Sequence, residues 1–560
     1  MASQSWLGPV FAYDWLTSSR RWQGYALRSL LVLQLLLGLS AVWARSGGAE
    51  ELSIPQQVQI GRAFYVVTTL VVLGLVGLAA PAATAGAICL DKARGNLTLL
   101  FTTDLTDAEI VLGKLAARLL PVLGLIACAA PVQALATLFG GVDPVVLTGA
   151  ILVCVACAVF GCTLALTLSV WGRKTHEVLL VTYAFGLAWL LAPPIWAVTV
   201  SMLPWQIRPP WLPSYLALMP YNPVVLIIGP LDPPPGMRIG LGEQAWFCTL
   251  GLLASALLAA AATWRIRAVV VRQASRAEVA RHGDRRLSWP RLLPSPSLDG
   301  NPVLWREWHR RRPSRWSAAV WGLFIVLSTG FSLWAIFQVL GGGGIGGRDS
   351  GAAISGMQVS AGLLLLSVSA ATSLAEERQR GSLDVLLATP LSTRSIVLGK
   401  WWGAFRTVPL LAVLPVLIAA ALATHTGFII GPVLIGGLIV SYGAAITSLG
   451  LALATWLPQM GRVIGLTAGL YLVVLIGAVP VGMSLFGYWA GAGIASASPF
   501  WGVGFSSAMI GGTAGPGRQI GTHAAWLVFW IVAYCLVAVG LLLATLKTFN
   551  RCLGRIEARS

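Results

Sequence analysis

Charged residues are scarce in this chain of 560 residues: they make up 10% of the sequence, whereas hydrophobic residues make up 57%. Acidic residues are the scarcest, with 20 Asp and Glu against 38 Lys and Arg. Because a soluble globular protein has about 25% charged residues, this composition excludes that class and indicates an integral membrane protein. The net charge of +18 is typical of cytoplasmic loops that face anionic lipid. Nucleic-acid binding would need an aromatic platform or a reader motif, and the sequence has neither.

The residues of metal and nucleotide sites are also missing. The five histidines are scattered through loops, and six of the eight cysteines lie in apolar segments, so neither a zinc site nor a disulfide framework is expected. A P-loop ends in Gly-Lys followed by Ser or Thr, whereas Gly113-Lys114 and Gly399-Lys400 are followed by Leu and Trp. We therefore expect the chain to bind no cofactor, no metal and no ATP, and not to be an enzyme by itself.

Long apolar stretches dominate what is present. A helix needs about 20 apolar residues to cross a bilayer, and twelve windows meet that length: Gly24–Trp43, Ala63–Ile88, Leu119–Phe139, Pro144–Trp171, Val178–Val200, Ala245–Val271, Ser317–Leu340, Ile354–Ala375, Ala404–Thr424, Ile429–Trp456, Val463–Phe486 and Ala524–Phe549. All 20 acidic residues lie in loops or at the ends of these windows. Proton pumps and ion-coupled carriers place such residues inside the membrane. A proton-driven or cation-selective pathway is therefore disfavoured, and Na⁺ sites made of carbonyls and hydroxyls stay open.

The cations divide unequally between the two sides of these windows. Alternate loops hold 32 cations on one side and six on the other, and Lys and Arg accumulate on the cytoplasmic side of a membrane. We therefore expect a multi-pass protein of the plasma (inner) membrane with both termini in the cytoplasm.

The sequence contains an internal repeat. Gly95–Lys114 (elbow one) and Gly381–Lys400 (elbow two) share ten of twenty positions without a gap, including IVLGK at the end. Upstream, Gly8–Trp15 (GPVFAYDW) matches Asn301–Trp308 (NPVLWREW). The predicted fold is an all-α integral membrane protein with twelve transmembrane helices in two parallel six-helix repeats, each preceded by an amphipathic interfacial helix. The repeats are expected at residues 1–272 and 301–560, with an Arg/Pro-rich cytoplasmic linker at 273–300.

Each elbow is a charged loop between the second and third spans of its repeat. Asn96 or Ser382 is expected to cap a short helix that has one apolar stripe. Thr106 or Ser392 is expected to cap a second helix that continues into the third span. Such a loop can be a solvated connection, but two equal elbows also suit the docking of a symmetric pair of partner subunits.

The elbows resemble the loop after the second span in permease subunits of ATP-binding cassette (ABC) transporters of the type-2 exporter family. Asn301–Glu307 (NPVLWRE) resembles the pre-membrane segment of that family, and the likeness covers most of the chain, once per half. The resemblance implies that the elbows hold coupling helices, which receive motion from separate ATPase subunits. It also implies that Gly8–Trp22 and Asn301–Trp316 lie along the cytoplasmic leaflet.

Elbow one departs from the family pattern, because Asp104 stands where Pro390 gives elbow two a rigid helix start, and Leu90 stands where the second copy has Glu376. Equal engagement of the two elbows is therefore open. The residues that the resemblance assigns to the ATPase-coupling elbows are Asp91, Lys92, Arg94, Gly95, Asp104, Glu109, Lys114, Glu376, Glu377, Arg378, Arg380, Gly381, Asp384, Pro390, Arg394 and Lys400. Those assigned to the interfacial helices are Asp14, Trp15, Arg21, Trp22, Glu307, Trp308, Arg315 and Trp316.

These features predict the membrane-spanning permease of an ABC-type exporter. Two ABC ATPase subunits are its expected partners, together with membrane lipids and an amphipathic or lipid-like substrate that moves between the two repeats. The alternatives are a secondary transporter of the major facilitator type, which also has twelve spans in two halves, and a non-transporting membrane scaffold. The missing intramembrane charges count against the secondary transporter, while the sequence says little against a scaffold.

Overall fold

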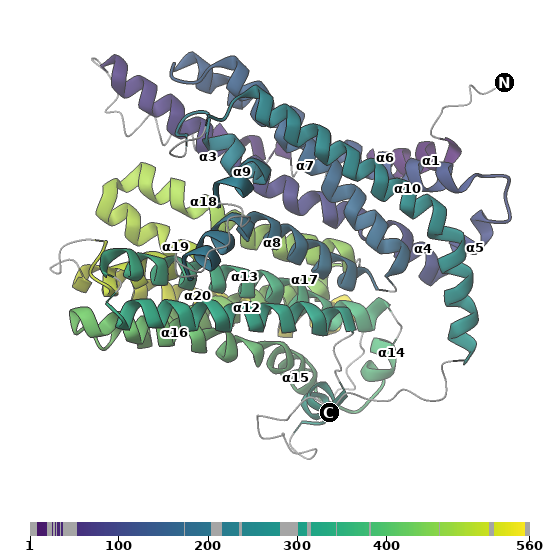
Figure 1. Cartoon of the computed structure of the whole chain (residues 1–560). Coiled ribbons are helices and arrows are strands. Elements are labelled where there is room, and N and C mark those ends of the chain that lie inside the picture. The colour runs from purple at the N-terminus through teal and green to yellow at the C-terminus, as the bar shows by residue number, and fades with distance from the viewer. Residues whose placement is uncertain are drawn as a thin grey trace. The chain divides into compact units, whose positions relative to one another are not determined.

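The computed structural model describes residues 8–19, 25, 28–29, 31–33, 35–36, 53–172, 174–202, 215–233, 238–279, 301–310, 315–342, 344–379, 382–458, 460–514 and 520–554. The chain forms two compact units, Met1–Arg285 (unit one) and Arg286–Ser560 (unit two), which are treated separately below. The regular structure of the described residues is helical throughout (Figure 1).

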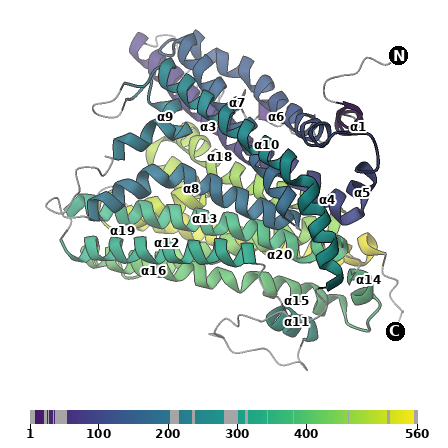
Figure 2. The same ribbon diagram turned by 45° about the vertical axis from the view of Figure 1, so that its right-hand side comes forward.

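The helices of unit one, in chain order, are α1 (Gly8–Ser19), α3 (Ile54–Thr84), α4 (Gly86–Arg94), α5 (Asn96–Leu100), α6 (Asp107–Leu138), α7 (Pro144–Trp171), α8 (Thr175–Met202), the 3₁₀ helix η2 (Tyr215–Tyr221), α9 (Pro223–Ile228) and α10 (Leu241–Val279). Helix α3 packs on α6 and α7, and α10 packs along α7. The short helix α1 lies beside α6 (Figures 1 and 2).

The helices of unit two are α11 (Pro302–Arg310), α12 (Arg315–Leu340), α13 (Gly344–Gln379), α14 (Ser382–Leu387), α15 (Thr393–Phe405), α16 (Thr407–Thr426), α17 (Gly431–Trp456), α18 (Met460–Ala495), α19 (Pro499–Ile510) and α20 (Ile520–Leu553). Helix α13 is central, since it contacts α12, α16, α17, α18 and α19. Helix α11 lies beside α15 (Figure 2).

Small residues allow the close packing around α13. A Cβ added at Gly450 of α17 would lie 2.9 Å from the backbone nitrogen of Ala371 in α13, and one added at Gly356 of α13 would lie 2.7 Å from the carbonyl oxygen of Phe500 in α19. Helices in a bilayer gain most of their mutual attraction from such close backbone contact, because lipid is as apolar as their side chains. The glycines therefore explain how α13 carries helices on several sides.

Ten helical segments of the described residues are long and apolar enough to cross a membrane. They correspond to ten of the twelve predicted windows, and the predicted window Pro144–Trp171 has the same bounds as α7. The first window, Gly24–Trp43, lies mostly outside the described residues. The fifth, Val178–Val200, lies within α8, a helix of 28 residues that is not among the ten. The total of twelve spans in two repeats stays a prediction.

A short helix precedes the last span of each unit. In unit one, Asn222 caps α9 by accepting from the backbone N–H of Val224 at 2.9 Å. In unit two, Ser498 caps α19 by accepting from the backbone N–H of Trp501. A polar residue in the first turn of each last span contacts the short helix: Gln244 donates to the carbonyl of Leu226 at 2.9 Å, and His523 lies 3.0 Å from the hydroxyl of Ser506.

Candidate functional site

Elbow one begins with a sharp turn at Gly95. Helix α4 ends at Arg94, and Gly95 then takes a left-handed conformation, with φ of +75°, which costs glycine little and other residues more. The next helix, α5, contains Asn96 as its first residue, so the prediction that Asn96 caps this helix is wrong: the turn is made by Gly95 instead. Leu97 of α5 is fully buried in an apolar cluster contributed by α4, α6, α7 and α10. This burial fixes α5 to unit one.

Elbow two is anchored in the same way. Leu383 and Leu386 of α14 are buried, as the apolar stripe predicted. Ser382 is the first residue of α14, and its hydroxyl donates to the carbonyl of Glu377 at 3.4 Å, so the prediction that Ser382 caps the helix from outside is also wrong by one residue. Arg380 and Gly381, which the sequence assigned to this elbow, lie outside the described residues.

The second helix of each elbow begins at the predicted cap. Thr106 and Glu109 form a capping box, in which Thr106 accepts from the backbone N–H of Glu109 at 3.2 Å and Glu109 accepts from the backbone N–H of Thr106 at 2.8 Å. Ser392 caps α15 by accepting from the backbone N–H of Ser395 at 3.2 Å. Pro390 precedes that cap by two residues, so it does not form the helix start that the sequence suggested.

Each elbow turns one large apolar side chain outward at the same aligned position. Leu99 of α5 is 68% exposed and Val385 of α14 is 72% exposed, although their neighbours Leu97 and Leu383 are buried. The polar residues around them differ. Elbow one exposes Asp104, and elbow two exposes Asp384, Pro390 and Arg394. A single exposed apolar residue is ordinary on a protein surface, so what distinguishes Leu99 and Val385 is that they occupy aligned positions of the two elbows.

A group of four charges around the buried Lys114 joins α1, α4 and α6 in unit one, and we call it charge cluster one. The ammonium of Lys114 lies 2.5 Å from a carboxylate oxygen of Asp91 and 3.9 Å from one of Asp14. Arg118 lies 3.9 Å from the same oxygen of Asp14. Lys114 is the last residue of elbow one, and its side chain is almost fully buried. Buried charges are stable only when they are paired, so this cluster ties the three helices together.

Charge cluster two joins α11, α13 and α15 in unit two. The ammonium of Lys400 forms ion pairs with Glu307 and, at 2.7 Å, with Glu377. Arg306 also pairs with Glu377. The side chains of Lys400 and Glu307 are 1% and 4% exposed, respectively, which makes this the more buried of the two clusters.

The two clusters use residues that the sequence repeat aligns. Lys114 corresponds to Lys400 and Asp91 to Glu377 between the elbow segments, and Asp14 corresponds to Glu307 between the interfacial segments. Sequence reasoning named all six residues but did not predict that they meet. It missed the fourth member of each cluster, Arg118 and Arg306. Arg306 could have been noticed as the cation of NPVLWRE, beside a Glu that would be buried.

A second pair of aligned cations lies at the ends of α7 and α17. The ammonium of Lys92 donates to the carbonyls of Val170 at 2.8 Å and Gly172 at 2.6 Å, where α7 ends. Arg378, which aligns with Lys92, donates to the carbonyls of Thr455 at 3.1 Å and Leu457 at 3.3 Å, where α17 ends. The last carbonyls of a helix lack intrahelical donors and carry partial negative charge, so a cation is favourable there.

The last span of each unit also reaches its elbow, which the sequence did not reveal. In unit one, Arg267 of α10 lies 3.3 Å from Asp107, and its guanidinium lies over the ring of Phe101. In unit two, Thr393, which aligns with Asp107, donates to the side chain of Asn550 in α20 at 2.8 Å. Elbow, interfacial helix and last span therefore meet at one end of each unit.

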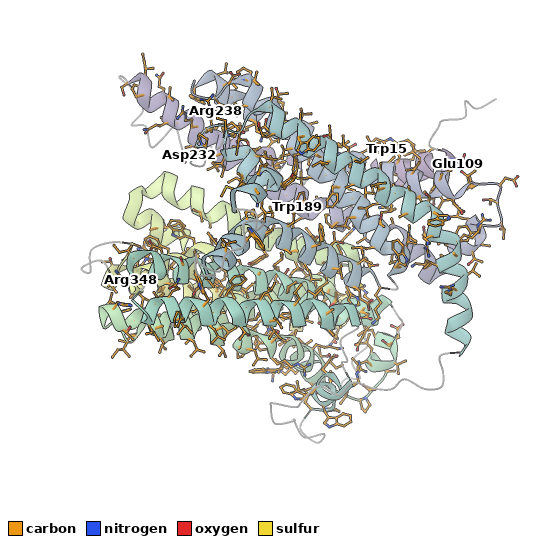
Figure 3. All side chains as sticks on the ribbon, viewed as in Figure 1. Trp15, Glu109, Trp189, Asp232, Arg238 and Arg348 are labelled. Atoms are coloured by element: carbon orange, nitrogen blue, oxygen red, sulfur yellow. The ribbon has the colours of Figure 1, made fainter. Side chains whose placement is uncertain are left out.

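The remaining interfacial residues are only partly where the sequence placed them. Trp15 stacks with Phe11 on α1, near Glu109 in the view of Figure 3, and Trp308 of α11 lies under the guanidinium of Arg406. Two assigned residues, Arg315 and Trp316, belong to the spanning helix α12 rather than to the interfacial helix. Arg21 and Trp22 lie outside the described residues, while Arg94 ends α4 and Glu376 lies in the last turn of α13.

The far end of each unit carries different residues. In unit one, Figure 3 shows Asp232 and Arg238 at the end of the helices away from Trp15 and Glu109. In unit two, Arg348 donates to the carbonyl of Gly511 at 2.9 Å, at the end away from α14. No group of three His, Cys, Asp or Glu side chains in the described parts of the chain could hold a metal ion.

One comparison with known families gives a match. Residues 302–483, from α11 into α18, match the ABC-2 type transporter family. The matched stretch contains elbow two and all four residues of charge cluster two. No curated protein matches the chain.

Proposed function

We propose that the chain is the permease of an ABC-type transporter and that separate ATPase subunits drive it through both elbows, because residues 302–483 match the ABC-2 type transporter family. The match over residues 302–483 is the observation that carries the proposal. The matched family is a different class of transporter from the secondary transporters of the major facilitator type.

We propose that unit one is a second copy of the same permease domain. At aligned positions, both units have a buried lysine in contact with a carboxylate, a cation at the end of the fourth span and an outward apolar residue. A shared ancestral unit explains these coincidences, because unrelated bundles have no reason to repeat them at aligned positions. The pore would then be a pseudo-dimer within one chain, with twelve spans and both termini in the cytoplasm of a plasma-membrane protein.

The ATPase contact is proposed at the outward faces of α5 and α14. Leu99 and Val385 offer each subunit one apolar anchor, while Leu97 and Leu383 hold the elbow to its own bundle. A force on the anchor is then carried into α6 or α15 through the capped helix starts at Thr106 and Ser392. The cargo is proposed to be amphipathic or lipid-like, because charged residues are kept to the ends of the spans.

The test is reconstitution with a purified ABC-type ATPase. In lipid nanodiscs, the chain should bind that ATPase and stimulate its ATP hydrolysis. A matched control replaces Leu99 and Val385 by Asp in one chain, which changes only exposed positions and should abolish the stimulation. If the unmodified chain neither binds nor stimulates the ATPase, and an ion gradient alone drives transport in liposomes, the proposal is wrong.

A further inference from the structure

The two charge clusters have the same composition but not the same arrangement. Each contains two carboxylates, one buried lysine and one arginine. A lysine between two carboxylates leaves one negative charge uncompensated, and an uncompensated buried charge is strongly unfavourable. The arginine supplies the missing positive charge in both units, but it comes from a different helix in each.

The arginine occupies positions that do not align. Arg118 lies one turn after Lys114 on α6, and the corresponding residue of unit two is Ala404, which is buried. Arg306 lies beside Glu307 on α11, and the corresponding residue of unit one is Tyr13, which is 73% exposed. Each unit therefore has a cation at one of the two positions and an uncharged residue at the other.

We propose that Arg118 and Arg306 are equivalent positioning residues that fix the interfacial helix of each unit to its bundle. Arg118 does so from α6 of the bundle, whereas Arg306 does so from the interfacial helix α11 itself. In unit one, Asp14 of the interfacial helix contacts both Lys114 and Arg118 of α6. In unit two, Glu307 of the interfacial helix contacts Lys400, and Arg306 of the same helix reaches Glu377 of α13. Either arrangement attaches the interfacial helix to the bundle at two charged contacts.

The second contact adds a second favourable charge interaction to the attachment: in unit one Lys114 and Arg118 both lie 3.9 Å from the same oxygen of Asp14, whereas in unit two the contacts are made by two residues of α11. With both contacts in place, α1 should move with α6, and α11 should move with α13 and α15. The consequence for transport rests on the proposed function: an ATPase that displaces an elbow would displace the interfacial helix, and with it the surface of the cytoplasmic leaflet. Loss of the arginine would leave the elbow docked but would loosen this attachment.

Amide hydrogen exchange on the full chain in nanodiscs tests the inference without any ATPase. Arg118→Ala should raise exchange in α1 about tenfold, whereas Arg118→Lys, which keeps the charge, should stay near the unmodified rate. Adding Tyr13→Arg to Arg118→Ala rebuilds the arrangement of unit two inside unit one and should restore slow exchange. Tyr13→Arg alone tests the effect of the new cation by itself and should leave exchange in α1 unchanged.

Two controls separate the positioning role from general loss of structure. Arg267→Ala removes a half-exposed ion pair to Asp107 at the same elbow and should leave exchange in α1 unchanged. Exchange in α7 should stay constant in every variant, which shows that the bundle is intact. The inference is overturned if Arg118→Ala leaves α1 protected, or if the double variant exchanges as fast as Arg118→Ala while α7 stays protected. Because no ATPase is present, either result is independent of whether the chain stimulates one.

Discussion

The ammonium of Lys92 lies 2.6 Å from the carbonyl oxygen of Gly172, so the end of α4 is held to the end of α7 by a side chain that acts as a helix cap. Lys92→Met removes this charged donor and leaves the last carbonyls of α7 without it. A hydrogen bond to a charged group contributes about 1.5–3 kcal/mol, and we expect a loss of roughly 2 kcal/mol in the unfolding free energy of unit one. Thermal unfolding in detergent would measure it.

Unit two provides the matched control for this change. Arg378 makes the same contact with the end of α17, so Lys92→Arg should preserve stability where Lys92→Met does not. Equal losses for the Met and Arg variants would mean that packing of the lysine side chain, and not its charge, holds the two helix ends together.

Lys400→Met should be the most destabilising single change at either cluster. It removes the cation that pairs with both Glu307 and Glu377, and breaking a buried pair costs about 3–5 kcal/mol. Lys114→Met should cost less, because Asp14 and Asp91 are more exposed than Glu307. Denaturant unfolding of the two variants would rank them.

Removing a carboxylate should repair part of the Lys400→Met defect. Glu307→Gln added to Lys400→Met deletes one of the two negative charges while keeping nearly the same volume, so the double variant should be more stable than Lys400→Met alone. A double variant that is less stable would show that repulsion between carboxylates is not the source of the loss.

Much of the membrane architecture could be predicted because bilayer thickness imposes a length of about 20 apolar residues on every span. Pro144–Trp171 was located by this criterion alone. The helix starts at Thr106 and Ser392 were also predicted, because capping depends on residues three positions apart. The cap at Asn96 was mislocated, because Gly95 already turns the chain.

The charge clusters could not be predicted in the same way. Asp14, Asp91 and Lys114 are far apart in the sequence, and their meeting depends on how α1 and α4 are rotated against α6. Neither the apolar pattern nor the repeat specifies that rotation. The alignment shows that these three positions carry charges of the same sign in both copies. That agreement indicates ion pairing only when a structure shows that the side chains are close.

Gly399 controls how closely α11 approaches α15. A Cβ at this position would lie 3.0 Å from the backbone nitrogen of Leu304 and 3.0 Å from the Cβ of Val303. Gly399→Ala should therefore push α11 outward, and overpacking of this kind costs about 1–3 kcal/mol. The same displacement should weaken the contact of Glu307 with Lys400, and faster amide exchange in α11 would report it.

A glycine with open space around it is the control for that substitution. Nothing lies within 4 Å of a Cβ added at Gly322 of α12, so Gly322→Ala should be neutral or slightly stabilising, because alanine favours the helix. If both substitutions have the same effect on exchange in α11, the close approach at Gly399 does not position that helix.

The exposed elbow residues give a prediction about how strongly each elbow binds the ATPase. Leu99 and Val385 occupy aligned positions, but Asp104 accompanies Leu99, while Asp384 and Arg394 accompany Val385. Leu99→Asp and Val385→Asp, made separately, should each lower the affinity for the ATPase about tenfold, which corresponds to roughly 1.4 kcal/mol for one lost apolar anchor. Each variant should retain the stability of the unmodified chain, because neither side chain is buried.

Salt should then distinguish the two elbows. When Val385→Asp leaves elbow one as the main contact, the acidic Asp104 should make ATPase binding fall with rising salt if the partner surface is basic. When Leu99→Asp leaves elbow two, the opposite charges of Asp384 and Arg394 should make binding less sensitive to salt. Binding of the purified ATPase to nanodisc-embedded variants at 50 and at about 300 mM salt would decide. Identical salt dependence would show that both elbows bind through their apolar anchors alone. The presence of Asp104 in elbow one, where elbow two has Pro390, would then not make the two elbows unequal.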